Sequence, residues 1–256
     1  MQGNAHKPPL RLLRQGFPDR PAFGTAVSSA ILQRVAAGEL PATLRLHRPA
    51  RELAFAKQDR VAAGFGAAVE AARNSGFEPV VRLAGGRAAV FHEGTLAIAW
   101  ADPNPRPVAE TQVRFALMAG VLEGALRRLG VDARVGEVAG EYCPGAWSIN
   151  ARGVKKLSGV GQRMITGAAH AGAVVVVTGS GEVRDVLVRV YAALALEWDP
   201  DTTGAVEDEV AGVGLAETEE AILAELTTRF DLIEAEIDDD TLALATELET
   251  DHVPRA

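Results

Sequence analysis

The chain has 256 residues, of which 48% are hydrophobic and 23% charged, so it is long enough for one large domain with a sizeable core. No apolar run approaches the ~18 residues of a membrane span, and the first residues lack the apolar core of a secretory signal. One cysteine cannot form an internal disulfide, and the five histidines are too scattered for a zinc site. We therefore expect a cytoplasmic protein without a membrane segment or a metal.

The net charge of −8 hides an asymmetry between two parts of the chain. Residues 197–256 hold 19 acidic and two basic residues, whereas residues 1–196 carry more basic than acidic ones. This predicts a mildly basic body over 1–196 and an acidic, mainly helical extension over 197–256 that packs on it. Alternatively, the basic part attracts an acidic partner protein. Nucleic acid is not expected, because no run of Lys or Arg interleaves with aromatic residues.

Apolar periodicity predicts alternating strands and helices in the first half of the chain. Strands are expected at 10–14, 42–47, 79–83 and 88–100, and helices at 22–37, 61–74 and 110–129. Gly85-Gly86 stands between two of these strands, which predicts a hairpin. In the third helix, Val113, Leu117, Val121 and Ala125 share one face, and Gly130 follows as the capping position.

The second half predicts strands at 133–138, 146–150, 161–166 and 173–178, then a helix at 182–194. The apolar, β-branched run at 173–177 is typical of a central strand covered on both faces. The extension should hold a helix at 217–229, a strand at 232–237 and a helix from Thr241 with Asp240 as its N-cap. The mixture of hairpins and helices indicates an α+β fold with a mixed, mostly antiparallel sheet and flanking helices.

The candidate chemistry lies between Glu141 and Val177. Cys143 precedes Pro144-Gly145, and a tight turn there would present its thiol at a loop apex as a nucleophile. A single cysteine is otherwise a small filler of the core. Lys156 precedes Ser158-Gly159, where small residues let the backbone approach a ligand, although a lysine at a hairpin turn is usually solvated.

Two further groups of residues are candidates. Arg82, Gly85, Gly86 and Arg87 form a loop that either makes a tight turn or exposes backbone N–H groups to a carboxylate or phosphate. Its spacing matches neither a Walker loop nor a dinucleotide fingerprint. His92 and His170 are possible bases for Cys143, and each is otherwise a packing or surface histidine.

These motifs resemble the lipoate/biotin protein ligase superfamily, which includes lipoate–protein ligases and octanoyl or lipoyl transferases. The resemblance rests on Arg82-Leu-Ala-Gly-Gly-Arg-Ala88, on Phe91-His-Glu-Gly-Thr-Leu96 and on Lys156-Leu-Ser-Gly-Val-Gly-Gln-Arg163, and it spans about residues 10–195. It implies the catalytic-domain fold of that superfamily, over residues 1–196. The residues it implies for substrate binding are Arg82, Gly85, Gly86, Arg87, His92, Ser158, Gly159, Gln162 and His170.

Tyr142-Cys143-Pro144-Gly145, followed thirteen positions after the cysteine by Lys156, is most similar to the cysteine-dependent octanoyl/lipoyl amidotransferases. Those enzymes move an acyl chain from the glycine-cleavage H protein to E2 lipoyl domains. The resemblance implies that Cys143 carries the acyl thioester and that Lys156 binds the acyl carbonyl. It implies lipoyl-domain proteins as partners and no cofactor beyond the octanoyl or lipoyl group.

Two alternatives stay open. An ATP-dependent lipoate–protein ligase would use ATP and Mg²⁺, and its acyl-adenylate would lie against Lys156 and the Gly85-Gly86 loop. Ligases usually have two arginines and three glycines there, so Val81-Arg82 and Gly85-Gly86-Arg87 favour the transferase. A non-catalytic relative would bind lipoylated or fatty-acylated partners, but it should have lost Cys143 or Lys156, and this chain keeps both.

Overall fold

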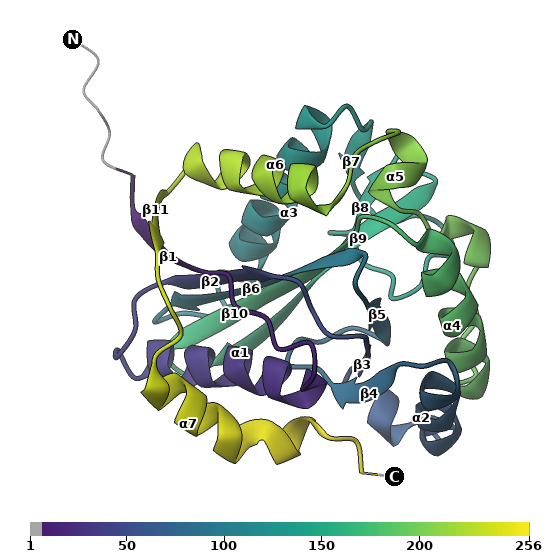
Figure 1. The fold of residues 1–256 in the computed structure, drawn as a ribbon, viewed down its shortest axis with the longest axis horizontal. Helices are drawn as coiled ribbons and strands as arrows, with labels where there is room; N and C mark the ends of the chain where they lie inside the picture. Colours follow the sequence, from purple (N-terminus) through teal and green to yellow (C-terminus); the bar gives the residue numbers. More distant parts are fainter. Residues whose placement is uncertain (1–6, 256) are drawn as a thin grey trace.

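Two sheets organise residues 7–255, the part of the chain that the computed structural model describes (Figure 1). The large sheet runs in the order β11 (Asp231–Glu234), β1 (Pro9–Leu13), β2 (Thr43–His47), β6 (Thr95–Pro103), β10 (Ala168–Val176), β9 (Lys155–Ile165), β8 (Ile149–Ala151) and β7 (Ala133–Val135). The small sheet runs in the order β4 (Glu78–Val81), β3 (Glu52–Phe55) and β5 (Ala89–Phe91).

Most neighbouring strands of the large sheet are antiparallel. Only β1 with β2 and β1 with β11 pair in parallel, so the predicted mixed, mostly antiparallel sheet is confirmed. β10 lies between β6 and β9, and eight of its nine residues are buried. Its run of valines therefore forms the central strand that the β-branched sequence predicts.

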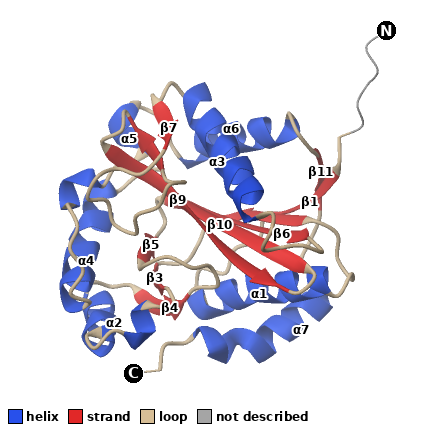
Figure 2. Ribbon diagram, turned by 180° about the vertical axis from the view of Figure 1, so that it is seen from behind, coloured by secondary structure: helices blue, strands red, loops and turns tan. Residues whose placement is uncertain are grey.

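Helices cover both sheets. α3 (Thr111–Arg128) and α6 (Leu215–Thr227) pack together over one face of the large sheet, and α1 (Pro21–Ala36) and α7 (Asp239–Leu248) pack over the other (Figures 1 and 2). α2 (Phe65–Asn74) and α4 (Ser180–Ala193) pack together beside the small sheet, and α5 (Val206–Glu209) is a short turn. Single 3₁₀ turns are η1 (Asp59–Val61), η2 (Pro200–Thr202) and η3 (Glu249–His252). Among residues 7–255, no helix has the length and apolarity needed to span a bilayer.

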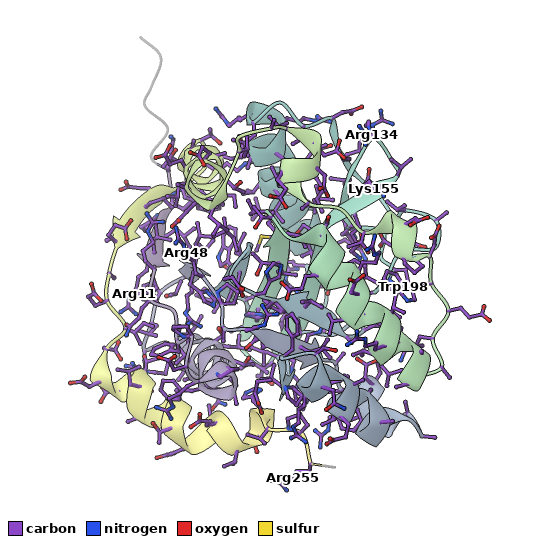
Figure 3. The ribbon with its side chains drawn as sticks, turned by 45° about the vertical axis from the view of Figure 1, so that its right-hand side comes forward. Arg11, Arg48, Arg134, Lys155, Trp198 and Arg255 are labelled. Atoms are coloured by element: carbon purple, nitrogen blue, oxygen red, sulfur yellow. The ribbon has the colours of Figure 1, made fainter. Side chains whose placement is uncertain are left out.

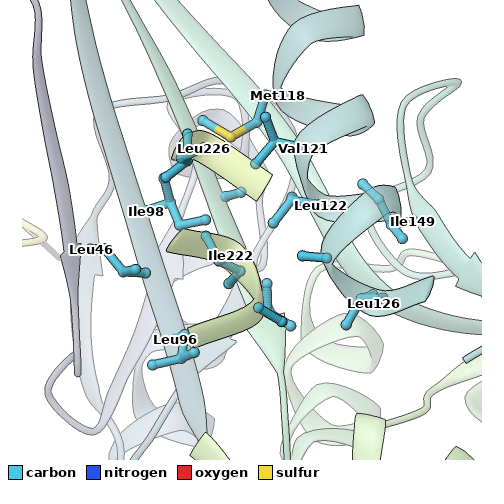
Figure 4. Packing of buried hydrophobic residues seen from close by; sticks show 14 of the residues in the cluster. Leu46, Leu96, Ile98, Met118, Val121, Leu122, Leu126, Ile149, Ile222 and Leu226 are labelled. Atoms are coloured by element: carbon cyan, nitrogen blue, oxygen red, sulfur yellow. The ribbon is translucent and has the colours of Figure 1, made fainter. Parts of the chain in front are cut away.

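The two faces of β6 differ in the size of their side chains. Leu46, Leu96 and Ile98 belong to the core cluster that packs against α3 and α6 (Figure 4). Successive side chains of a strand point to opposite faces. Ala97 and Ala99 therefore face α1 and the small sheet, where their small side chains leave room for a cavity.

Residues from 197 onward pack against the preceding part of the chain. β11 extends the large sheet beside β1, and Arg11, which Figure 3 shows beside the C-terminal segment, donates to the Glu236 carbonyl at 2.6 Å. Further ion pairs join arginines of the body to this acidic segment: Arg20–Glu249 at 2.6 Å, Arg128–Glu225 at 3.0 Å and Arg152–Glu209 at 3.0 Å. The division at residue 196 stays a prediction.

Four details of the sequence prediction are wrong. β4 and β5 do not form a hairpin, because the short strand β3, which the sequence analysis missed, pairs with both. Lys156 lies within β9, not before a strand that starts at Gly161. Asp238, not Asp240, caps α7, since its carboxylate accepts from Thr241 N at 2.9 Å. Val113 is 66% exposed, because the buried stripe of α3 runs through Met118, Val121, Leu122 and Ala125.

Candidate active site around Cys143

The loop between β7 and β8 presents the only cysteine in an unusual backbone conformation. Cys143 has φ of 44°, in the left-handed region that residues other than glycine rarely adopt. Its N–H donates to Tyr191 Oη at 2.9 Å, and this hydroxyl donates to the Ala88 carbonyl at 3.1 Å. Such a conformation costs about 1–3 kcal/mol and persists where the surroundings hold it. The predicted loop position is therefore confirmed, and Tyr191 of α4 supports the loop.

A buried ammonium holds the same loop from β9. Lys156 is 1% exposed, and its Nζ donates to Glu141 Oε1 at 3.1 Å, to the Tyr142 carbonyl at 2.9 Å and to the Cys143 carbonyl at 2.7 Å. An ammonium has three N–H donors, so all of them are used within the loop. Lys156 thus fixes both the position and the local charge of the cysteine.

Glu141 is the counter-ion of this lysine, and the sequence analysis missed its role. Its side chain is fully buried, and its carboxylate accepts from Gly145 N at 3.1 Å, Ser148 Oγ at 2.5 Å and Val138 N at 3.2 Å. A lone glutamate before Tyr-Cys forms no recognisable motif. The available signal was physical, because a buried lysine requires an acidic partner.

The Cys143 thiol lies under the loop that follows β4. Sγ accepts from Arg87 N at 3.1 Å and is 3.6 Å from Arg82 Nη2. Burial alone would raise the pKa of Cys143, but the Arg82 charge, the Lys156 charge and the Arg87 N–H outweigh it, so the pKa lies below its ordinary value. A Cβ on Gly86, whose φ is 104°, would lie 2.9 Å from Sγ, so this close approach requires glycine.

An open cavity lies beside the thiol. Phe115 and Trp147, stacked with ring centroids 6.1 Å apart, form part of its wall. The predicted site residues that line it are Arg82, Gly85, Gly86, Cys143, Lys156, Gly159 and Gln162. The Gln162 amide donates to the Thr111 carbonyl at 2.9 Å and accepts from Arg114 Nε at 3.0 Å, so it ties β9 to α3.

Three predicted residues lie elsewhere. His92 lies at the β5–β6 turn, where its Nδ1 accepts from Gly94 N at 3.1 Å. Ser158 is fully buried in β9 and lines neither cavity described here. His170 of β10 lines a second cavity. Within residues 7–255, neither histidine hydrogen-bonds to Sγ, whose partners are Arg82 and Arg87.

The second cavity lies between the large sheet, α1 and the small sheet. It adjoins the first one, because Arg82, Gly159 and Val174 line both. Burial raises the pKa of Glu52 to about 8 and lowers that of His170 to about 4. The sequence analysis missed Glu52 because it lies in the unpredicted strand β3.

One group of side chains has metal-ligand chemistry. Ligand atoms of His92, Glu93 and Glu182 lie within 4.8 Å of one another. Arg51, however, pairs with Glu93 at 3.0 Å and with Glu182, and Gly94 N occupies the Nδ1 of the histidine. These groups already satisfy one another, so we assign no metal here.

Comparisons with known proteins agree on one family. The family model of the lipoyl protein ligase A/B catalytic domain matches residues 20–226. An octanoyl-[GcvH]:protein N-octanoyltransferase of Geobacillus kaustophilus is 27% identical over 190 residues, which cover 74% of this chain and 64% of that protein. The protein of the same name from Exiguobacterium sibiricum is 33% identical over 152 residues, covering 59% and 54%. The matches thus span less than two thirds of these relatives.

Solved structures share the fold. Lipoate-protein ligase A bound with ATP superposes with a TM-score of 0.76 at 23% identity over 94% of both chains. A bipartite lipoate protein ligase of Thermoplasma acidophilum, studied with its E2 lipoyl domain, gives 0.74 at 21% identity over 95% of this chain and 92% of that one. The predicted α+β catalytic-domain fold is therefore confirmed.

Proposed function

This chain belongs to the lipoyl protein ligase A/B catalytic-domain family, and from that premise we propose that it transfers an octanoyl or lipoyl group to a lysine of a lipoyl-domain protein through a thioester on Cys143. The observation that carries the proposal is the environment of the thiol. The Arg82 guanidinium and the Arg87 backbone N–H contact Sγ, and the buried Lys156 ammonium holds the loop. The pKa of Cys143 is lowered as a result. A thiolate rather than a thiol is the nucleophile in such chemistry.

The first step forms the thioester. The Cys143 thiolate attacks the carbonyl carbon of an acylated donor lysine, the C–S bond forms, and the C–N bond to the donor breaks as its nitrogen takes up a proton from solvent. In this proposal the Arg87 N–H and the Arg82 guanidinium, which contact Sγ, stabilise the negative charge that develops on the carbonyl oxygen.

The second step releases the acyl group to the acceptor. A deprotonated lysine of the acceptor attacks the thioester carbon, its nitrogen loses a proton to solvent, and Cys143 leaves as a thiolate. The groups that lower the pKa of this thiol also make it a better leaving group. The same environment therefore serves both halves of the transfer.

Lys156 has a positioning role in this proposal as well as the predicted contact with the acyl carbonyl. Its three N–H groups bind Glu141 and the carbonyls of Tyr142 and Cys143, so a contact with the acyl carbonyl requires one of these bonds to exchange. Holding the Cys143 carbonyl also supports the left-handed backbone that aims the thiol at Arg82 and Arg87.

The two adjoining cavities suggest where the acyl chain lies. In this proposal it extends from Cys143 past Arg82, Gly159 and Val174, the residues common to both cavities, toward the space beside α1. A Cβ on Gly159 would lie 3.3 Å from Lys156 Cε, so glycine keeps this passage open beside the lysine. Donor and acceptor are proposed to be lipoyl-domain proteins, the glycine-cleavage H protein and E2 subunits, in the cytoplasm and without ATP.

The decisive experiment is the intact mass of the protein after incubation with octanoylated H protein, with and without Mg-ATP. We expect one octanoyl adduct that forms without ATP and is absent in Cys143→Ser. Release of pyrophosphate from ATP and free lipoate by a Cys143→Ala variant would instead establish the ligase alternative. Saturable binding of acylated H protein with no adduct and no turnover would establish the non-catalytic alternative.

A further inference from the structure

Cys143 and Arg87, which meet at the thiol, belong to two segments that are anchored separately. The cysteine loop is held from β9, where Lys156 donates to the carbonyls of Tyr142 and Cys143. The segment after β4 is held from η1, because the fully buried Asp59 carboxylate lies 3.3 Å from Arg87 Nη1. The position of Sγ relative to Arg87 N therefore depends on what joins the two segments.

One side chain other than the cysteine joins them by hydrogen bonds. Tyr191 Oη accepts from Cys143 N at 2.9 Å and donates at 3.1 Å to the carbonyl of Ala88, the residue after Arg87. Within the described residues 7–255, every other hydrogen bond between the cysteine loop, residues 136–148, and residues 82–88 ends on Sγ. The Tyr191 hydroxyl thus sets how the two segments lie relative to each other.

The backbone of the cysteine makes this bridge important. Cys143 has φ of 44°, a conformation that persists only where its surroundings hold it. Without an acceptor for its N–H, the residue can relax toward an ordinary φ, which would turn its side chain. Sγ would then move away from Arg87 N and Arg82 Nη2, the two groups that contact it.

Tyr191 itself does not reach the substrate. Its side chain is 2% exposed and lines neither cavity. Burial is the largest cause of a raised pKa for Tyr191, so the hydroxyl keeps its proton, which it donates to Ala88. Trp198, labelled in Figure 3, packs with ring centroids 5.5 Å from Tyr191 and 5.9 Å from Tyr142 and so restrains the tyrosine ring.

We propose that Tyr191 is a positioning residue for the transfer reaction, whose hydroxyl keeps the Cys143 thiol in register with the Arg87 N–H. The proposal rests on the proposed function, because the reaction that benefits is the attack of Cys143 on an acyl carbonyl. The bridge serves both steps, since the same alignment stabilises the thiolate before it attacks and when it leaves.

The test removes the hydroxyl and keeps the ring, as Tyr191→Phe. The rate of Cys143 alkylation by iodoacetamide is measured over a series of pH values, and its midpoint should rise by about one pH unit as Sγ loses its contacts. In transfer from octanoylated H protein, kcat should fall by about ten-fold or more, the effect of misplacing a reacting group by about 1 Å. KM should change by less than about two-fold.

Thr218→Val is the matched control. It also removes a buried hydroxyl that donates to a backbone carbonyl, that of Gly214 at 2.8 Å, but Thr218 lies in α6 and lines neither cavity. Its alkylation midpoint and kcat should match those of wild type. Trp198→Leu is a milder second variant that loosens the tyrosine ring but keeps the hydroxyl, so its midpoint should rise by less. Thermal melts report whether each variant folds.

The outcomes separate this inference from the proposed function. If Tyr191→Phe folds and its alkylation midpoint matches that of wild type, the hydroxyl only stabilises the fold and the inference is wrong. The inference is equally wrong if Tyr191→Phe does not fold and Trp198→Leu leaves the midpoint unchanged. Alkylation needs no acyl donor, so it decides the inference even if no donor acylates wild-type Cys143, which is the result that would overturn the proposed function.

Discussion

The two cavities that share Arg82 differ in how their buried ionisable side chains are paired. Around Cys143, buried charges have close partners: the Lys156 and Glu141 side chains are 2% and 0% exposed and lie 3.1 Å apart, and the pKa of the thiol is lowered. Around Glu52 and His170, burial shifts the pKa of each group toward its neutral form, and at Glu52 the charge of Arg45 offsets this shift only in part. The first cavity is thus built for an ion, whereas burial in the second favours the neutral forms of Glu52 and His170.

The largest expected effect comes from breaking the buried ion pair of the first cavity. Glu141→Gln leaves the Lys156 ammonium without its counter-ion, so we expect a loss of about 3–5 kcal/mol in the free energy of unfolding. Urea denaturation measures this loss. Transfer activity should fall with it, because the carboxylate also holds Gly145 and Ser148 of the cysteine loop.

A double variant shows whether charge is the cause. Replacing both partners, as Glu141→Gln with Lys156→Met, removes the unpaired charge and should be more stable than Glu141→Gln alone. If the double variant instead loses as much free energy of unfolding as the two single variants together, the pair contributes only packing.

His170 in the second cavity should make the folded protein less stable in acid. The pKa of His170 is about 4 when folded and about 6.5 when unfolded. Between these pH values the unfolded chain binds more protons at His170 than the folded chain does. The contribution of His170 to the free energy of unfolding is therefore fully present above pH 6.5 and is lost as the pH drops toward 4. His170→Gln should remove on the order of 3 kcal/mol of this dependence. Urea denaturation at a series of pH values measures it, and identical slopes for variant and wild type would contradict it.

The charge that lowers the pKa of Cys143 is testable by alkylation. Arg82→Gln removes a positive group 3.6 Å from Sγ, so the pKa of the thiol should rise and its reaction with iodoacetamide at pH 7 should slow by about ten-fold. The wild-type thiol, whose pKa is lowered, should still react with iodoacetamide below pH 8. Arg184→Gln, which removes a surface arginine paired with Asp185, is the control and should leave the rate unchanged.

The periodic parts of the fold were predictable from sequence because local pattern determines them. The long helices, the central strand of valines and the antiparallel character of the sheet all follow from apolar spacing. The four residues of β3 were missed because Glu52–Phe55 is short and follows a proline-containing turn. That omission created the false hairpin at Gly85-Gly86, since only β3 shows that β4 and β5 are separate.

The site was predictable only where the residues form a motif. Cys143, Lys156 and the Gly85-Gly86 loop were found from their spacing, and the structure brings them together. Glu141 and Glu52 have no motif, because their importance comes from burial and from partners distant in sequence. Tyr191 supports the cysteine from a helix nearly fifty residues away. Such contacts exist only after the chain has folded.

The smallest predicted effect comes from an exposed ion pair, which serves as a reference for the buried pair of the first cavity. Arg20 and Glu249 form an ion pair at 2.6 Å outside both cavities, with side chains 50% and 26% exposed. Glu249→Gln is the cleaner change, because the Arg20 guanidinium also lies 3.9 Å above the Phe23 ring. Water screens exposed charges, so the variant should lose no more than about 1 kcal/mol in urea denaturation, and added salt should shrink the difference further. A loss as large as that of Glu141→Gln would show that burial does not distinguish the two pairs, and the assignment of the first cavity as the one built for an ion would then lose its energetic basis.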